Sequence, residues 1–298
     1  MDRKSFLRKG ALGAAGLVVG GRVATSAGTP AAAPMRASTY DRMREQVGFN
    51  HLPNPSDDMS ANSVLHRAAT RGHANHGWLD THHTFSFANY RNPERMNFGV
   101  LRVLNDDVVA GGKGFGAHPH DNMEIVSIPL EGDLEHQDSM GNKTVIREGD
   151  VQVMSAGTGV THAEYNANSD KPVKFLQIWM FPKRRNVAPR YDQIALDAAD
   201  NAITQILSPE RDDAGVWVHQ DAWWSVAKFD AGKGDTYTLH RPGTHGVYAF
   251  VLEGEVTVDA QDLGPRDGYG VWDVESIGIR ADSDGARVLL MEVPMEIG

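Results

Sequence analysis

Short runs of apolar and β-branched residues recur along the chain from about residue 65 onward, and several of them alternate apolar with polar positions. The clearest runs are 84–88, 100–104, 124–130, 175–181, 215–219, 224–227 and 247–252. Clusters of Gly, Asn and Asp separate them, as expected for turns between strands. Many short strands at this spacing predict an all-β fold built from barrels or sandwiches.

A polar, proline-containing stretch interrupts the strand pattern near residue 185 and leads into 194–203, for which we predict a short helix. The triplet Leu130-Glu131-Gly132 before this connector returns after it as Leu252-Glu253-Gly254, which indicates an internal repeat. The repeat predicts two domains in tandem, 65–185 and 186–298.

Composition narrows the class of protein. The 298 residues are 41% hydrophobic, which is typical of a globular protein, and carry a formal net charge of −10. This acidic balance argues against nucleic acid as a partner, because phosphate binding needs clustered Lys and Arg. The absence of cysteine excludes disulfides, thiolate metal ligands and a cysteine nucleophile.

The first 27 residues have the pattern of an export signal. A basic segment at 2–9 precedes a Gly- and Ala-rich apolar run at 10–21, which is too short to span a bilayer, and Thr25-Ser26-Ala27 offers a cleavage site. The basic segment resembles a twin-arginine signal in which Lys4 replaces the second arginine.

We therefore expect a signal peptide at 1–27, export to the periplasm by the twin-arginine route, and no membrane span after cleavage. The alternative is a disordered amphiphilic extension, which would leave the protein in the cytoplasm. Residues 28–64 are rich in Ala, Pro, Ser and Asn and are predicted to be a linker.

Two pairs of potential metal ligands lie in the first half. His118 and His120 form one pair, and His162 and Glu164 form the other. Side chains two residues apart on a strand point to the same face, so each pair directs both donors to one side. Each pair also follows a Gly-rich turn, which favours a built site over chance spacing.

Three imidazoles and one carboxylate form a donor set of intermediate softness. Such a set suits divalent Fe, Mn, Co, Ni, Cu or Zn better than Ca or Mg. Around an octahedral ion it would leave two positions free for a substrate or O2, so the pattern predicts a reactive centre and not a closed structural one.

Several phrases resemble the pirin family within the cupin superfamily. The matching segments are GHANHGWLDTHHTFSFANY (72–90), GFGAHPHDNMEI (114–125), LEGDLEHQDSMGNK (130–143), MSAGTGVTHAEYN (154–166) and QIWMFP (177–182). The resemblance covers about residues 65–298. It implies a bicupin fold of two antiparallel jelly-roll barrels, with a metal-binding first domain and a degenerate second domain.

The resemblance also assigns roles. It implies one divalent ion, Fe(II) first among the candidates, held by His118, His120, His162 and Glu164. Many cupins use a carboxylate at the position of Glu124, but in the pirin pattern that duty passes to Glu164, which would also accept the substrate's hydroxyl proton. The implied activity is quercetin 2,3-dioxygenase-like opening of a flavonol with O2, by a protein that we expect to be a monomer.

Two other functions stay open at this point. Some pirins are non-catalytic, metal-dependent regulators, although an export signal and a strongly acidic composition count against that role. A dioxygenase acting on another enolisable aromatic is the second alternative.

Alignment of the repeated triplets places His240 opposite His118 but Pro242 opposite His120. The second half therefore lacks the ligand pairs, and we expect it to close one end of the site, to stabilise the first domain or to bind something without a metal.

Other histidines could form further sites. Four of them lie close together: His73, His76, His82 and His83. Their spacing fits no single strand face, so loop or supporting roles are favoured over a second metal site. His136 and Asp138 also lie two residues apart, but in a segment rich in turn-forming residues. They are predicted to stabilise a turn, with contact to the metal ligands as the alternative.

Overall fold

The computed structural model describes residues 62–297. The predicted signal peptide and nearly all of the predicted linker lie outside these residues. The described part consists of strands and one 3₁₀ turn, η1 (Ala68–Thr70), which confirms the all-β prediction. Within 62–297 no helix has the length and apolar character needed to cross a membrane.

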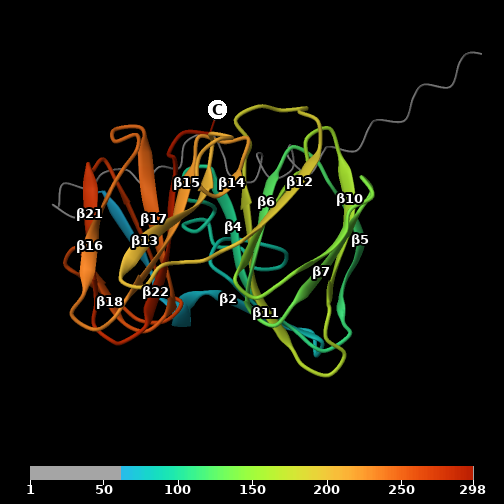
Figure 1. The fold of residues 1–298 in the computed structure, drawn as a ribbon, viewed down its shortest axis with the longest axis horizontal. Helices are drawn as coiled ribbons and strands as arrows, with labels where there is room; N and C mark the ends of the chain where they lie inside the picture. Colours follow the sequence, from blue (N-terminus) through green and yellow to red (C-terminus); the bar gives the residue numbers. More distant parts are fainter. Residues whose placement is uncertain (1–61, 298) are drawn as a thin grey trace, which may run out of the picture. The chain divides into compact units, whose positions relative to one another are not determined.

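The first half is built from two sheets (Figure 1). The larger has seven strands in the order β12-β9-β6-β11-β4-β3-β2, and the smaller has four in the order β5-β10-β7-β8. The strands of the larger sheet are β2 (Gly72–Asn75), β3 (Leu79–His83), β4 (Leu101–Val109), β6 (Glu124–Glu131), β9 (Asp150–Ser155), β11 (Val173–Met180) and β12 (Arg190–Ala195). Those of the smaller sheet are β5 (Gly114–His120), β7 (Leu134–Asp138), β8 (Lys143–Ile146) and β10 (Val160–Asn166).

The second half repeats this architecture. Its seven-stranded sheet has the order β1-β20-β17-β22-β15-β13-β14, and its four-stranded sheet the order β16-β21-β18-β19. The strands of the larger sheet are β1 (Ser63–His66), β13 (Ala202–Ser208), β14 (Val216–Trp217), β15 (Trp223–Phe229), β17 (His245–Glu253), β20 (Gly268–Trp272) and β22 (Ala286–Pro294). Those of the smaller sheet are β16 (Gly234–Thr238), β18 (Val256–Val258), β19 (Gln261–Leu263) and β21 (Ser276–Ala281). The described strands pair antiparallel except β13 with β14, as the bicupin expectation requires.

The two halves exchange a strand. β1 precedes the first half in sequence but pairs with β20 of the second half. β12 follows the predicted boundary near residue 185 but pairs with β9 of the first half. The large sheet of the second half is therefore completed by β1, which precedes the first half in sequence. The large sheet of the first half is completed by β12, which follows residue 185.

The short helix predicted over 194–203 is wrong. Arg190–Ala195 forms the edge strand β12, and Ala202–Ser208 forms β13. A short segment without strong capping signals forms a helix only weakly by itself. Here the backbone N–H and C=O groups of these residues form hydrogen bonds with β9 and β15 instead, which holds the chain in an extended conformation.

The largest apolar cluster joins the two halves. The seven-stranded sheets lie side by side in the centre of Figure 1, with the four-stranded sheets outside them. Leu104 and Ile178 of the first half and Trp224, Phe250 and Met291 of the second belong to this one buried cluster. Burial of each such side chain contributes about 1.5–3 kcal/mol to folding.

The interiors of the two halves differ. An apolar cluster packed around Phe229, Val251 and Leu290 fills the second half. The corresponding cluster of the first half is smaller and consists of Leu79, Val109, Leu134, Ile146, Val173 and Phe175. The rest of the first half's interior holds buried polar residues, among them His120, Ser127 and His162.

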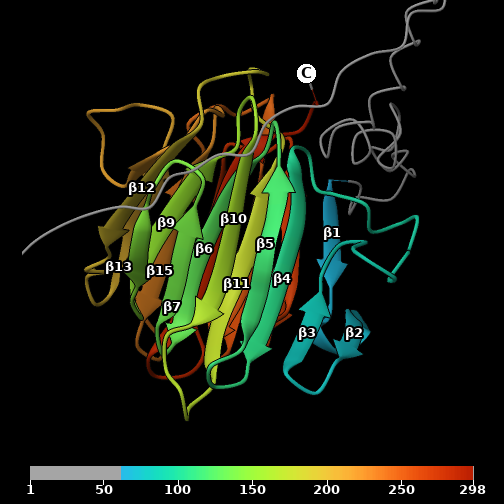
Figure 2. The ribbon, with the colours of Figure 1, turned by 90° about the vertical axis from the view of Figure 1, so that its right-hand side faces the viewer.

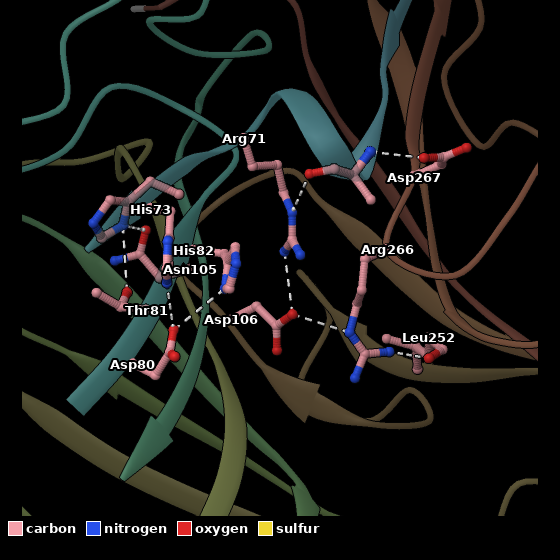
Figure 3. A network of polar contacts seen from close by, with 12 residues as sticks. Arg71, His73, Asp80, Thr81, His82, Asn105, Asp106, Leu252, Arg266 and Asp267 are labelled. Carbon is pink, nitrogen blue, oxygen red and sulfur yellow. Dashed lines mark hydrogen bonds and ion pairs between the residues drawn. The ribbon is translucent and has the colours of Figure 1, made fainter. Parts of the chain in front are cut away.

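An arginine–aspartate clamp links the halves at the base of the β2–β3 hairpin (Figure 3). Asp106 on β4 accepts hydrogen bonds through Oδ2 from Arg71 Nη1 at 3.1 Å and from Arg266 Nε at 3.0 Å. Arg266 belongs to the second half, where it also donates to the Leu252 carbonyl. Arg266 has a φ of 67°, an uncommon value for a residue with a side chain, so these contacts hold a backbone turn as well as the side chain.

We expect Asp106→Asn to lower the free energy of unfolding by about 1–3 kcal/mol, because two largely buried guanidinium groups lose their anionic partner. Guanidinium chloride unfolding measures the change. Glu253→Gln, which removes an exposed pair with Arg287, is the matched control and should change stability by no more than about 0.5 kcal/mol. Equal effects of the two substitutions would contradict the clamp.

Candidate metal centre

Three histidines meet on the inner face of the four-stranded sheet of the first half. His118 and His120 lie on β5, and His162 lies on β10 directly opposite His118; Figure 2 shows β5 and β10 among neighbouring strands. The Nε2 atoms of His118 and His162 are 3.0 Å apart. The ring centroid of His120 is 4.8 Å from that of His118 and 4.9 Å from that of His162. The predicted i, i+2 geometry therefore brings these three imidazoles together.

The nitrogen atoms of these rings fit a metal ion. Nδ1 of His118 lies 2.8 Å from the Gly116 carbonyl oxygen, which can only accept, so Nδ1 carries the proton and Nε2 offers its lone pair. Both ring nitrogens of His120 and Nδ1 of His162 are buried without a hydrogen-bond partner. Buried polar atoms rarely stay unpaired in native proteins, and a cation among these lone pairs would satisfy them.

Burial also fixes the protonation state of two of the rings. It lowers the pKa of His120 to about 3, and the neighbouring His162 and His118 rings contribute to the shift. Burial likewise lowers the pKa of His162 to about 3, with a contribution from His118. Both rings are therefore neutral at physiological pH, which is the form that binds metal.

Glu164 lies on β10 beside His162 and is also buried. Its Oε1 accepts from Ser127 Oγ at 3.1 Å, and its Oε2 accepts from Gln177 Nε2 at 2.7 Å. A possible ligand group of His136, His162 and Glu164 lies next to the group of His118, His120 and His162, and only His162 belongs to both. The structure thus brings Glu164 to the edge of the three-histidine set, and its role as a fourth ligand stays a prediction.

A bulge on β5 lies between His118 and the residue opposite Glu164. Along the β5–β10 pair the partner of His162 is His118, but the partner of Glu164 is Phe115, so β5 holds one more residue than β10 between the two pairs. At this point β5 approaches β10 closely: a Cβ on Gly114 would lie 2.2 Å from the Glu164 carbonyl oxygen. Glycine is therefore required here.

Glu124, the other carboxylate considered from the sequence, points away from the histidines. It is fully buried on β6 and accepts hydrogen bonds through Oε2 from Ser155 Oγ at 2.8 Å and from the His219 backbone N–H at 3.2 Å. Because His219 belongs to the second half, Glu124 lies where the halves meet. These contacts give Glu124 a structural role between the two halves.

The sequence reasoning missed the role of Ser127 and Gln177, which hold Glu164. Each is a polar residue between apolar neighbours in the middle of its strand, Ser127 on β6 and Gln177 on β11. That interruption of an apolar run is the signal that could have identified them.

His136 and Asp138 do more than stabilise a turn. Asp138 does accept from the backbone N–H groups of Met140 and Asn142, as predicted. However, His136 is fully buried on β7 opposite Glu164, and its Nε2 lies 3.1 Å from Asp138 Oδ2. The pair therefore also lines the interior beside the candidate centre.

The upstream histidines divide into separate environments. His83 is buried, and its Nδ1 lies 2.8 Å from Asn105 Oδ1, which is a structural contact. His73 and His82 face each other across the β2–β3 hairpin. The prediction from spacing considered each strand face by itself, whereas these two residues belong to two strands that the hairpin brings together.

In the second half His240 is engaged in a different cluster. Its Nδ1 lies 2.9 Å from Glu292 Oε2, and its ring stacks on Trp223 at 4.7 Å between centroids. Within residues 62–297 the groups of His and carboxylate residues close enough to share an ion all lie in the first half.

Comparison with known proteins places both halves in known families. The family model described as Pirin matches residues 64–180, and that described as Quercetinase C-terminal cupin domain matches 205–293. The chain is 45% identical to a quercetin 2,3-dioxygenase of Escherichia coli over 77% of this chain and 98% of that protein. It is 40% identical to a pirin-like protein of Caulobacter vibrioides over 74% of this chain and 94% of that protein.

Solved structures give the same result. The bacterial pirin YhhW from Escherichia coli in complex with nickel(II) superposes with a TM-score of 0.74 at 42% identity, covering 79% of this chain and all of that one. A quercetin 2,3-dioxygenase from Acinetobacter baumannii at 20% identity has a TM-score of 0.63 over 78% of this chain and 79% of that one, and shows the shared fold.

The buried Glu124 gives a prediction about stability and pH. Burial raises the pKa of Glu124 from 4.5 to about 7. Between these values the unfolded chain releases the proton while the folded protein retains it, so this group destabilises the fold as pH rises to about 7 and adds no further change above. Glu124→Gln should therefore gain stability relative to the wild type across that window, by at most about 1.4 kcal/mol per pH unit.

Urea unfolding at a series of pH values measures this difference. Glu131→Gln, at the exposed end of the same strand, is the control. The difference in stability between this variant and the wild type should not increase between pH 4.5 and about 7. A Glu124→Gln curve parallel to the wild type at all pH values would show that Glu124 does not hold its proton in the fold.

Proposed function

The chain belongs to the pirin family, and we propose that it is a metal-dependent dioxygenase that opens flavonols such as quercetin with O2. Relatives at 40–45% identity named quercetin 2,3-dioxygenase or putative quercetin 2,3-dioxygenase support an oxidoreductase of this type. The observation in this chain that carries the proposal is the convergence of His118, His120 and His162, together with three buried ring nitrogens, both of His120 and Nδ1 of His162, that have no hydrogen-bond partner.

We assign the three imidazoles and Glu164 as the residues that would hold a divalent ion. Fe(II) is our proposal for its identity, and the donor set also accepts Mn, Co, Ni, Cu or Zn. The relative solved with nickel(II) supports a divalent ion in this family. When bound, the ion would supply Lewis-acid stabilisation of a deprotonated hydroxyl and access to O2 chemistry.

The protein's own groups set the charge at the centre. Three neutral imidazoles leave the charge of a divalent ion unchanged, and the carboxylate of Glu164 reduces it by one. The remaining positive charge favours an enolate such as the deprotonated 3-hydroxyl of a flavonol over a neutral phenol.

Glu164 is also placed to receive a proton. Each carboxylate oxygen offers two lone-pair positions, and Ser127 and Gln177 each use one of them. Binding of the ion would use a third position and would leave one free, while the two hydrogen bonds fix the orientation of the group. We propose that Glu164 accepts the hydroxyl proton of the bound substrate.

His162→Ala should release the ion held at this centre and reduce quercetin turnover by about 100-fold or more, because one of three convergent imidazoles is lost. The measurement is O2 uptake with quercetin by anaerobically purified, Fe(II)-loaded protein, with metal content determined for each variant. His76→Ala, at the exposed turn of the β2–β3 hairpin, is the control and should retain both metal and activity.

Two results would go against this proposal. A wild type that holds metal but leaves quercetin unchanged would reject the flavonol substrate and retain the metal centre. Equal turnover by the wild type and His162→Ala would reject the centre itself.

Glu164→Gln tests the proposed role of Glu164 as the acceptor of the substrate's hydroxyl proton. The amide keeps the size of the side chain and one oxygen acceptor but cannot take up a proton at neutral pH. If Glu164 is the base, kcat should fall by about 100-fold or more while the three-histidine set still retains metal. Full activity at unchanged metal content would show that another group accepts the proton.

A further inference from the structure

The outer face of the β2–β3 hairpin carries a second convergent group of metal-ligand side chains. His73 on β2 lies directly opposite His82 on β3, and their rings stack with 4.4 Å between centroids and 16° between planes. Asp80 lies two residues before His82 and so points to the same face. Its Oδ1 lies 2.8 Å from His73 Nε2 and 3.8 Å from His82 Nδ1 (Figure 3).

We propose that His73, His82 and Asp80 form a second binding site for a divalent transition-metal ion. Two imidazole nitrogens and one carboxylate oxygen form a donor set that suits Zn²⁺, Cu²⁺, Ni²⁺ or Co²⁺. The site shares no residue with the buried centre, and it does not depend on the proposed dioxygenase activity.

The distances fit one shared ion. Ligand atoms bound to the same ion at about 2.0–2.2 Å are about 2.8–3.6 Å apart in octahedral or tetrahedral geometry. Asp80 Oδ1 lies 2.8 Å from His73 Nε2, at the lower end of this range, and 3.8 Å from His82 Nδ1, just above it. One ligand atom from each of the three residues lies within 4.8 Å of the other two.

Neighbouring residues hold the group in place. Asn75 faces Asp80 across the hairpin and donates from Nδ2 to Asp80 Oδ2 at 2.9 Å. This bond leaves Oδ1 directed at the two histidines. The Asn75 side-chain oxygen in turn accepts from the Gly77 backbone N–H at 2.8 Å, which ties the amide to the turn of the hairpin.

The electrostatic surroundings also suit a cation. Partial burial lowers the pKa of His82, and the positive charge of Arg71 contributes to the shift, so His82 is neutral and able to bind at physiological pH. The charge of Arg71 is itself balanced by Asp106, which pairs with it at 3.1 Å. Asp80 adds a negative charge among the ligands.

The side chain of His73 is 51% exposed and that of Asp80 39% exposed, which distinguishes this site from the buried centre. An ion held there would keep water on its remaining positions. We therefore expect weaker binding than at the three buried histidines and a total of two ions per chain at saturating Zn²⁺.

The experiment separates the two sites. In the full-length His118→Ala/His162→Ala variant the buried centre is removed, and titration with Zn²⁺ against a chromophoric chelator should still show one ion per chain. Addition of His73→Ala or His82→Ala should weaken this binding by about tenfold or more. Addition of His76→Ala, an exposed histidine of the same hairpin outside the group, should not change it.

A second measurement covers the case in which the double variant does not fold. In the otherwise unchanged chain His73→Ala should lower the Zn²⁺ stoichiometry from two to one, and these exposed substitutions should leave the metal-free Tm unchanged. Zn²⁺ binding that persists in both His73→Ala and His82→Ala, or that His76→Ala weakens equally, would overturn the proposal. So would a wild type that binds a single ion. None of these results depends on quercetin turnover.

Discussion

The apolar packing between the two seven-stranded sheets is the interaction on which the rest of the structure depends. A barrel interior is normally filled with apolar side chains, as the second half is. The first half gives part of its interior to buried polar groups, which weakens its own core. The shared cluster around Leu104, Ile178, Trp224 and Phe250 offsets this loss, so a histidine-lined interior is stable because a second domain packs behind it.

The second half therefore has a physical role without any ligand of its own. Its His219 backbone N–H reaches across to Glu124, and its Arg266 reaches across to Asp106. These contacts fix the back of the sheet whose inner face carries Ser127 and Gln177, which orient Glu164. The geometry of the candidate centre is thus supported from the domain that lost the ligand pattern.

Local patterns in the sequence predicted the all-β fold and the residue pairs that share a strand face, but they did not determine which distant strands pair with each other. Two-residue spacing placed His118 and His120 on one face because a strand has a fixed period. The same argument missed the pairing of His73 with His82, since register across a hairpin is set by the turn. The strand β12 was missed because its partner β9 lies about forty residues earlier, and β1 finds its partner only near the end of the chain.

The exchange of β1 has a consequence for the order of events during synthesis. β1 begins at Ser63, but its partner β20 ends at Trp272, close to the carboxyl end of the chain. Contacts between residues so far apart form late, after the chain between them has become ordered. During synthesis β1 therefore has no partner strand until residues 268–272 have emerged, and at that point the sheet it joins still lacks its central strand β22 (Ala286–Pro294).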